Sequence, residues 1–507
     1  MGLHHAAVVA ADLEAARAFY GDLLGLGERS DRPTGIRPGH WFDVGAAQLH
    51  VLLPGGPGNH LAIEVDDIDA AVAELRRRGI DVADPYGIGG TPRVEGEALQ
   101  TIFEDPFGNR IEITETPSRS KPGRDDLLAW IEGNASDLAG WGSASEAAGR
   151  LVAPLLEALQ RCGMWRMLLP EWLGGSQLDP VSFVEVIEAL AATDASIAWC
   201  VCQAAGCSVA AAYLDRSAAE EVFAPGSVLA WGPDAGTRAL QVEGGWLVTG
   251  RWMWVSGVHH ADWLGGSCRL FDADGLPLSG PSGQQDVRTM LFPRSAATVT
   301  ESWNPMGLRA TGTDSISVDN LFVPAELSFA RDDVTARIDP APLYCFNHAP
   351  LFAAGFAAVV LGVARGSLDQ LVVLARSKTP HGRERPLRDS PVLQSQLARL
   401  TARLAASRSY LLAAVGRGWA EATGIGELSE QTRDGIRLAT SHAFTEAVAV
   451  ADSAFHAAGI DAIHVGGGFE RRLRDIRTAA QQYQGRDEHW EASGRALLAE
   501  SAPRPGG

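Results

Sequence analysis

The stretch "HHAAVVAADLEAARAF" at residues 4–19 returns in altered form at residues 60–74 as "HLAIEVDDIDAAVAE". Each copy has a histidine, His5 or His60, before short β-prone apolar residues, and an aspartate follows that histidine seven positions later, at Asp12 and Asp67. Apolar residues then recur at helical spacing, and an aspartate is a favoured residue for starting a helix. The repeat therefore predicts two copies of a strand followed by a helix.

Short strands separated by Gly and Pro follow each of these helices. They are "HWFDVGAAQLHVLLPGGPG" at 40–58 and "LQTIFEDPFGNRIEITE" at 99–115. Runs of this kind, bounded by turn-forming residues, are typical of β-strands. We therefore expect two βαβββ modules over residues 1–115, and the polar segment 116–126, "TPSRSKPGRDD", is typical of a linker.

Four side chains of these modules form a candidate metal site. Paired modules form a curved sheet, on which the first strands supply His5 and His60 and the last strands supply His50 and Glu112. Three imidazoles and one carboxylate suit Fe, Mn, Ni, Co or Zn. Adjacent residues of a strand point to opposite faces of the sheet, so His4, next to His5, is expected to face away from this site.

The repeat and "DPFGNRIEI" together resemble the glyoxalase/bleomycin-resistance (vicinal oxygen chelate) superfamily over residues 1–115. The resemblance implies either metal chemistry on vicinal oxygens or sequestration of a small molecule without metal. Position 50 often holds glutamate in glyoxalases, so His50 favours another member of the superfamily.

The rest of the chain has a different texture, with long helical patterns, then strands and turns over 227–330, then long helical patterns again. In "GGWLVTGRWMWVSGVHHADWL" (244–264), Trp252, Trp254 and Trp263 surround Ser256. Aromatic rings beside one hydroxyl suit a flat heterocycle such as a flavin ring. The glycine-rich turn of "GGGFERRLRDIRTAA" (466–480) opens a basic helix, which suits a phosphate.

These segments resemble the acyl-CoA dehydrogenase fold over residues 125–500. "LLPEWLGGSQLDPVSFVEVIEALAATDASIAW" (168–199) and "GRWMWVSGVHHADW" resemble its reduced-flavin monooxygenase branch, which includes dibenzothiophene monooxygenase and the oxygenase component of 4-hydroxyphenylacetate hydroxylase. The resemblance implies an α-helical domain, a β-barrel and a four-helix bundle, which we place at 127–225, 226–335 and 336–500.

The resemblance also implies a cofactor and its contacts. Reduced FAD or FMN would come from a separate reductase, and the chain has no nicotinamide-binding GxGxxG motif after a strand. Trp254 and Ser256 would lie against the flavin edge, and Trp231 would lie in a second flavin loop. The family is commonly tetrameric, so we expect a homotetramer or homodimer in which four residues reach the cofactor phosphates of a neighbouring subunit: Arg376, Gln394, Gly467 and Gly468.

Three positions depart from the family pattern. Gln484 stands where many acyl-CoA dehydrogenases have the glutamate that abstracts a proton, and an amide is no base. Gln482 and Cys207 stand where the monooxygenase branch often has histidines. Hydroxylation of a phenol needs such a base, so N- or S-oxygenation, or oxygenation of a carrier-bound substrate, is favoured. Other side chains that could assist the chemistry are Tyr483, His259, His348 and His381.

Bulk composition narrows the class of protein further. A net charge of −19 with a pI near 5.1 argues against a general nucleic-acid or anionic-membrane binder. The six cysteines form no CxxC pair, and we expect free thiols in a cytoplasmic protein. Residues 195–214 are uncharged, and Gln203 together with the small residues around it favours a buried helix over a membrane span.

The sequence thus predicts a flavin-dependent monooxygenase with a fused, metal-binding glyoxalase-like domain. Two alternatives stay open. An acyl-thioester dehydrogenase with FAD would be reduced by its substrate without oxygen. A small-molecule binding or resistance protein would bind a ligand without turnover.

Overall fold

The computed structural model describes residues 2–24, 26–29, 38–44, 47–54, 59–64, 68–77, 93–95, 98–104, 110–115 and 121–500, apart from 234–235, 281–282 and 332. The chain divides into two compact units, the first unit at Met1–Ser120 and the second unit at Lys121–Gly507. The division falls inside the segment 116–126 that we expected to be a linker.

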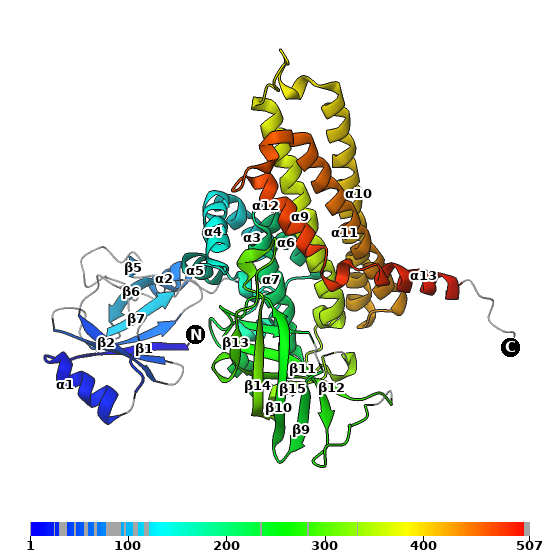
Figure 1. Cartoon of the computed structure of the whole chain (residues 1–507). Coiled ribbons are helices and arrows are strands. Elements are labelled where there is room, and N and C mark those ends of the chain that lie inside the picture. The colour runs from blue at the N-terminus through cyan, green and yellow to red at the C-terminus, as the bar shows by residue number, and fades with distance from the viewer. Residues whose placement is uncertain are drawn as a thin grey trace. The chain divides into compact units, whose positions relative to one another are not determined.

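The first unit is built on a seven-stranded sheet in the order β2-β3-β1-β4-β7-β6-β5 (Figure 1). The second copy of the repeat forms the predicted βαβββ module, whereas the first forms three strands among the described residues. Glu28 makes only a single bridge to Phe42 beside them. The strands are β1 (Gly2–Val9), β2 (Gly39–Val44), β3 (Ala47–Leu52), β4 (His60–Glu64), β5 (Arg93–Glu95), β6 (Ala98–Glu104) and β7 (Arg110–Glu115).

Both helices of the first unit pack on the same face of this sheet. α1 (Leu13–Arg17) packs near Phe42, and α2 (Ile68–Arg77) packs near Ile113. Strand side chains alternate between faces, and the strand register puts Phe42 and Ile113 on one face. The opposite face, which carries His5, is therefore left for a ligand.

The start of α1 follows the sequence prediction. The Asp12 side chain accepts hydrogen bonds from the backbone N–H groups of Glu14 and Ala15, as a helix N-cap does. The helix then widens into a π-helix over Ala18–Leu23. Asp67, the equivalent residue of the second copy, lies outside the described residues.

The second unit begins with helices that pack beside its sheet. They include α6 and α7, which start at the aspartate N-caps Asp179 and Asp194. The helices are α3 (Arg124–Gly133), α4 (Ala135–Ala148), α5 (Ala153–Arg161), α6 (Pro180–Thr193), α7 (Ala195–Ser208) and α8 (Arg216–Val222).

An eight-stranded sheet follows, at the lower end of the second unit in Figure 1. Its order is β13-β14-β10-β9-β11-β12-β15, with β8 pairing β11, and the two ends are not paired with each other among the described strands. The strands are β8 (Leu229–Gly232), β9 (Arg238–Val242), β10 (Gly245–Val255), β11 (Trp263–Phe271), β12 (Val287–Pro293), β13 (Thr298–Thr300), β14 (Asp314–Pro324) and β15 (Ser328–Phe329).

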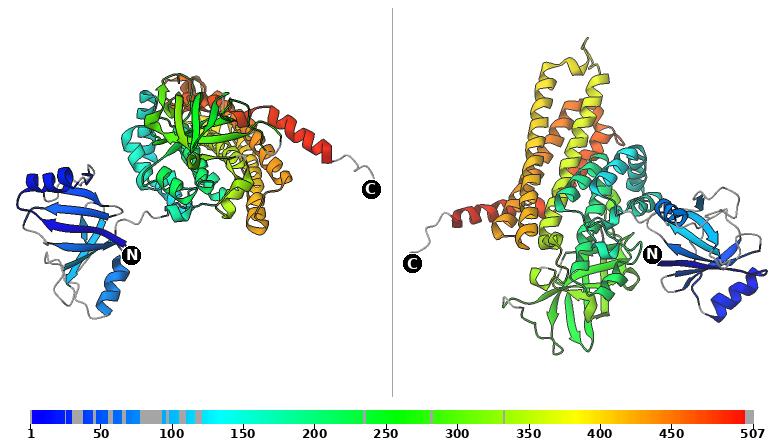
Figure 2. Two further views of the ribbon diagram at one scale, coloured as in Figure 1. Left: turned by 90° about the horizontal axis from the view of Figure 1, so that it is seen from below. Right: turned by 180° about the vertical axis from the view of Figure 1, so that it is seen from behind.

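Long helices complete the second unit, and three of them run side by side in Figure 1 and in the right view of Figure 2. Helix α9 packs against α6, α7, α11 and α12, which explains why α9 carries apolar residues on all of its faces. The helices are α9 (His348–Ser377), α10 (Pro391–Ile425), α11 (Glu430–Ala458), α12 (Gly468–Ala479) and α13 (Glu488–Glu500).

Two helical stretches of the second unit are long and apolar enough to span a membrane by composition alone. They are Ala195–Ala212, which is 94% buried in the fold, and His348–Ser377, which is 89% buried. Helices that face protein on all sides need this composition, so both are explained as core helices. The prediction for residues 195–214 agrees with this burial.

Candidate functional site

Three potential metal ligands of the first unit meet on the sheet face that the helices leave free. His5 comes from β1, His60 from the antiparallel neighbour β4, and Glu112 from β7 beyond it. The Nε2 atoms of His5 and His60 are 3.2 Å apart. Glu112 places Oε2 at 3.1 Å from the His60 Nε2 atom and Oε1 at 3.8 Å from the His5 Nε2 atom. One ligand atom from each residue lies within 4.8 Å of the others.

The fourth predicted ligand, His50, lies beside this group rather than in it. Its ring stacks on the His5 ring and on the Trp41 ring, with both pairs of ring centroids 3.9 Å apart. Its Nε2 atom lies 2.8 Å from the Oε1 atom of Gln48. The structure thus brings three of the four residues together, and the His50 ring stacks on the ring of His5.

The three residues suit a divalent metal ion. Glu112 is buried, and its Oε1 atom has no hydrogen-bond partner among the described residues. A buried carboxylate oxygen without a partner is costly, and a cation would satisfy it. Nitrogen and oxygen atoms that share one ion at about 2.1 Å lie roughly 3–3.5 Å apart, which is close to the separations seen here.

In the second unit, the tryptophans of β10 divide between core and surface. Trp252 is fully buried and donates from Nε1 to the Ser267 carbonyl at 3.1 Å. Trp254 has a φ of +60° and is 57% exposed, at a shift in register between β10 and β14. The shift turns its ring out of the sheet. Of these two predicted platform residues, only Trp254 is therefore available to a ligand.

Ser256, just beyond β10, lies at the centre of a buried polar group. Trp199 of α7 donates from Nε1 to the Ser256 hydroxyl at 3.0 Å. The Ser256 hydroxyl lies 2.8 Å from that of Thr313, which lies 2.6 Å from that of Thr311. Trp199, Thr311 and Thr313 were not predicted as site residues, although Trp199 ends the segment 168–199 that carried the family resemblance.

The loop that carries these threonines is tied to helix α12. Leu308 donates its backbone N–H to the Asp475 carboxylate at 2.6 Å, and Arg474 donates to the Met306 carbonyl at 2.7 Å. Burial raises the pKa of Asp475 to about 7, and the nearby Asp194 carboxylate adds to the shift. The position of the hydroxyls therefore depends on α12.

Cys207 and Trp231 lie together in the core. Gln203 bridges them, with its Nε2 atom 3.4 Å from the Cys207 sulfur and 3.3 Å from the Trp231 carbonyl oxygen. Burial raises the pKa of the Cys207 thiol, so that the thiol stays neutral. Trp231 is buried on β8, and the Arg331 guanidinium lies 5.6 Å from its ring centroid.

Gln482 and Tyr483 lie in the short turn after α12. The Gln482 side chain accepts a hydrogen bond from the backbone N–H of Gln484 at 2.8 Å, so it caps its own turn. Tyr483 is 56% exposed, and its ring packs edge-on to that of His489. Nothing in this geometry gives either residue the role of the missing histidine.

The predicted phosphate contacts lie at the ends of the long helices. Arg376 lies in the last turn of α9 and Gln394 in the first turn of α10, where Gln394 donates to the Arg388 carbonyl at 2.9 Å. Gly467 and Gly468 open α12. A Cβ atom on Gly468 would lie 2.5 Å from the end of the Gln370 side chain, which a change of rotamer can move, so this packing does not by itself require glycine.

The remaining histidine candidates are separate from one another. His259 pairs with Asp314 at 2.7 Å. Hydrogen bonds outweigh burial and leave the Asp314 pKa below its ordinary value. Burial lowers the pKa of the neighbouring His260 to about 4, so that this ring is neutral. His348 begins α9, and His381 is exposed after it.

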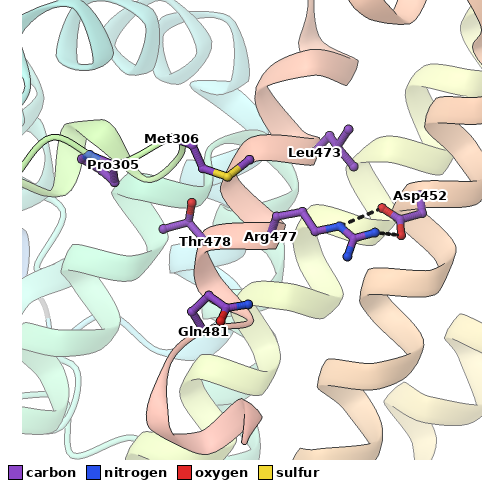
Figure 3. Close-up of a pocket in the computed structure, with 7 residues that line it drawn as sticks. All are labelled: Pro305, Met306, Asp452, Leu473, Arg477, Thr478 and Gln481. Carbon is purple, nitrogen blue, oxygen red and sulfur yellow. Dashed lines mark hydrogen bonds and ion pairs between the residues drawn. The ribbon is translucent and has the colours of Figure 1, made fainter.

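A surface pocket of about 630 Å³ lies between α11, α12 and the loop before Leu308 (Figure 3). Arg477 and Asp452 form an ion pair in its wall. None of the predicted site residues lines this pocket, which therefore is not the site that the sequence predicted. The lining residues are Pro305, Met306, Asp452, Leu473, Arg477, Thr478 and Gln481.

Two parts of the sequence match known families. Residues 2–113 match the glyoxalase/bleomycin resistance protein/dioxygenase superfamily, and residues 354–487 match the C-terminal domain of acyl-CoA dehydrogenases. The chain joins a glyoxalase domain to an acyl-CoA dehydrogenase-like unit. Both resemblances predicted from the sequence are confirmed.

Relatives of this acyl-CoA dehydrogenase-like chain are flavin-dependent monooxygenases. The indole-3-acetate monooxygenase of Pseudomonas putida is 28% identical over 356 residues, which cover 69% of this chain and 88% of that protein. The oxygenase subunit HsaA of Rhodococcus jostii is also 28% identical, over 64% of this chain and 86% of that subunit. XiaF from Streptomyces, solved with FADH2 and glycerol, shares the fold with a TM-score of 0.69 and 24% identity, over 75% of this chain and 97% of XiaF.

Proposed function

We propose that this chain is the oxygenase component of a two-component flavin-dependent monooxygenase. It would receive reduced FAD or FMN from a separate reductase. When bound, the reduced flavin supplies the two electrons with which one atom of O2 enters a substrate while the other leaves as water. The observation that carries the proposal is the exposed Trp254 ring beside the buried Ser256 hydroxyl, in a chain whose relatives are monooxygenases.

The flavin site would use these two residues in different ways. The Trp254 indole offers an apolar face to a flat ring, and the adjoining hydroxyl offers a hydrogen bond at the edge of that ring. XiaF, which shares the fold, was solved with FADH2, and related structures contain FMN, so both flavins are candidates.

The substrate class follows from the groups that could move a proton. Cys207 is a neutral buried thiol, and the Gln482 amide is neither an acid nor a base at neutral pH. Oxygenation at nitrogen or sulfur, where the substrate supplies its own lone pair, needs no base. We therefore propose a small organic or carrier-bound substrate that is oxidised at such an atom, rather than a phenol.

The replacement Trp254→Ala tests the flavin site. Under anaerobic conditions we expect wild-type protein to bind reduced FAD or FMN, and the variant to bind about 5–30-fold more weakly because the ring contact is lost. Trp490→Ala is the matched control, since Trp490 is a partly exposed tryptophan on α13. Equal weakening by both replacements, or no binding of reduced flavin by the wild type, would contradict the proposal.

For the first unit we propose a divalent metal held by His5, His60 and Glu112. Two imidazoles and one carboxylate with open positions are typical of non-haem Fe(II) sites. The ion would act as a Lewis acid toward vicinal oxygens of a ligand.

Metal analysis of the purified protein tests this site. We expect His60→Ala to lower the bound metal by at least about tenfold, because one of three ligands is lost. His40→Ala should leave the metal content unchanged, since His40 pairs with Glu28 and lies outside the group. Metal that survives in His60→Ala would exclude this ligand set.

We also propose that the chain works as a homotetramer or homodimer in the cytoplasm. Arg376, Gln394, Gly467 and Gly468 would then contact the cofactor of a neighbouring copy, which is consistent with their distance along the chain from Ser256 and with the exposed Val465 beside them. None of the six cysteines, all of which are described, forms a disulfide, and disulfides are rare in the reducing compartment that we propose.

A further inference from the structure

A row of buried hydroxyl groups leads away from the proposed flavin site. It runs from Ser256 through Thr313 to Thr311, and all three residues are at most 6% exposed. It ends at the Leu308 carbonyl, to which Thr311 donates at 2.8 Å. Trp303 donates from Nε1 to the same carbonyl at 3.0 Å and helps to hold it in place.

Taking the 2.8 Å contact between Thr311 and the Leu308 carbonyl as a hydrogen bond fixes the direction of the other two contacts in this row. A carbonyl oxygen can only accept, so the single hydroxyl hydrogen of Thr311 points to Leu308. The contact between Thr311 and Thr313 therefore uses the hydrogen of Thr313. The contact between Thr313 and Ser256 must then use the hydrogen of Ser256.

In this order, the Ser256 oxygen keeps one lone pair that no described residue uses. Its hydrogen is directed to Thr313, and one lone pair accepts from Trp199. A serine oxygen has two lone pairs, so one remains. Toward a ligand, the Ser256 hydroxyl can therefore accept a hydrogen bond but cannot donate one.

We propose that Thr311 and Thr313 are positioning residues that make Ser256 a fixed acceptor and so make the site selective for reduced flavin. The proposal rests on the proposed function, which places the flavin edge at Ser256. At that edge, reduced flavin carries an N–H at N5, whereas oxidised flavin has lone pairs at N5 and O4. An oxygen that can only accept forms a hydrogen bond with the N5–H of reduced flavin. It forms none with the lone pairs of oxidised flavin.

The order of bonds gives the replacement Thr313→Val a specific sign. Valine keeps the shape of the side chain but cannot accept, so the Ser256 hydrogen becomes free to turn toward the ligand. Oxidised flavin should then bind about 5–10-fold more tightly, while the affinity for reduced flavin changes little. A tenfold fall in selectivity corresponds to a decrease of about 30 mV in the midpoint potential of the bound flavin. A threonine with a merely structural role would weaken binding of both forms.

The experiment measures the dissociation constants of oxidised and reduced FMN and FAD, the latter under anaerobic conditions, together with the midpoint potential of the bound flavin. Wild type should prefer reduced flavin by at least about fivefold. Thr313→Ser, which restores a hydroxyl, should keep this preference. Thr300→Val, at an exposed threonine on β13, should also keep it.

The outcomes separate this inference from the proposed function. Wild type that binds no flavin in either form contradicts both. Wild type that binds reduced flavin without preference, or a preference that Thr313→Val leaves unchanged, overturns the inference and leaves the proposed function standing. Thermal melting shows whether each variant folds, and if Thr313→Val does not fold, loss of the preference in a folded Thr313→Ser would overturn the inference.

Discussion

At the scale of single residues, the second unit places an ionisable group, Asp475, where water does not reach it. Its carboxylate accepts from the Leu308 N–H and lies near Arg471, Asp194 and Glu146. Burial first, and then Asp194, raise its pKa to about 7. Because Leu308 anchors the threonine row, the ionisation of this carboxyl affects the site as well as the fold.

The pKa of Asp475 predicts a pH dependence of stability. The folded state binds this proton more tightly than the unfolded state, so ionisation lowers the free energy of unfolding as pH rises from about 4 to about 7. Asp475→Asn removes this term while keeping an acceptor for Leu308. From pH 5 to pH 8, the free energy of unfolding measured with urea should fall by about 1–3 kcal/mol more for wild type than for the variant. The same change in the free energy of unfolding with pH in both proteins would contradict the raised pKa.

Single residues also show what the sequence could reveal of the site. Trp254 and Ser256 are two positions apart, so one strand pattern was enough to pair them. Thr313 is far from Ser256 along the chain and meets it only because β10 and β14 are neighbours. Hydrogen-bond direction depends on such contacts, and no local pattern contains it.

At the scale of elements, close approach of backbones fixes the helical core. A Cβ atom on Gly362 of α9 would lie 2.3 Å from the Glu188 carbonyl of α6, so these helices cross where a side chain is missing. The apolar composition of α9 predicted that it is buried, but not which helix it crosses. In the first unit, the repeat predicted two equal modules, but the first copy forms one strand fewer than the second among the described residues. Strand pairing depends on partners as well as on propensity.

At the scale of the whole molecule, two units with different chemistry share one chain. The repeat and the tryptophan-rich segment each lie within one unit, which is why the sequence could reveal both families. Three of the four predicted metal ligands meet because matching strands are neighbours. The stacking of His50 on Trp41 depends on how the side chains pack, so it could not be predicted from the sequence.

The central claim is that this chain binds reduced flavin and directs its reaction with oxygen. The most direct measurement mixes the protein, loaded anaerobically with reduced FAD or FMN, with oxygenated buffer and follows the flavin absorbance. We predict that flavin on the protein returns to the oxidised form through an additional absorbing species that free flavin does not show, and that Trp254→Ala loses it. Reoxidation indistinguishable from that of free flavin would contradict the account.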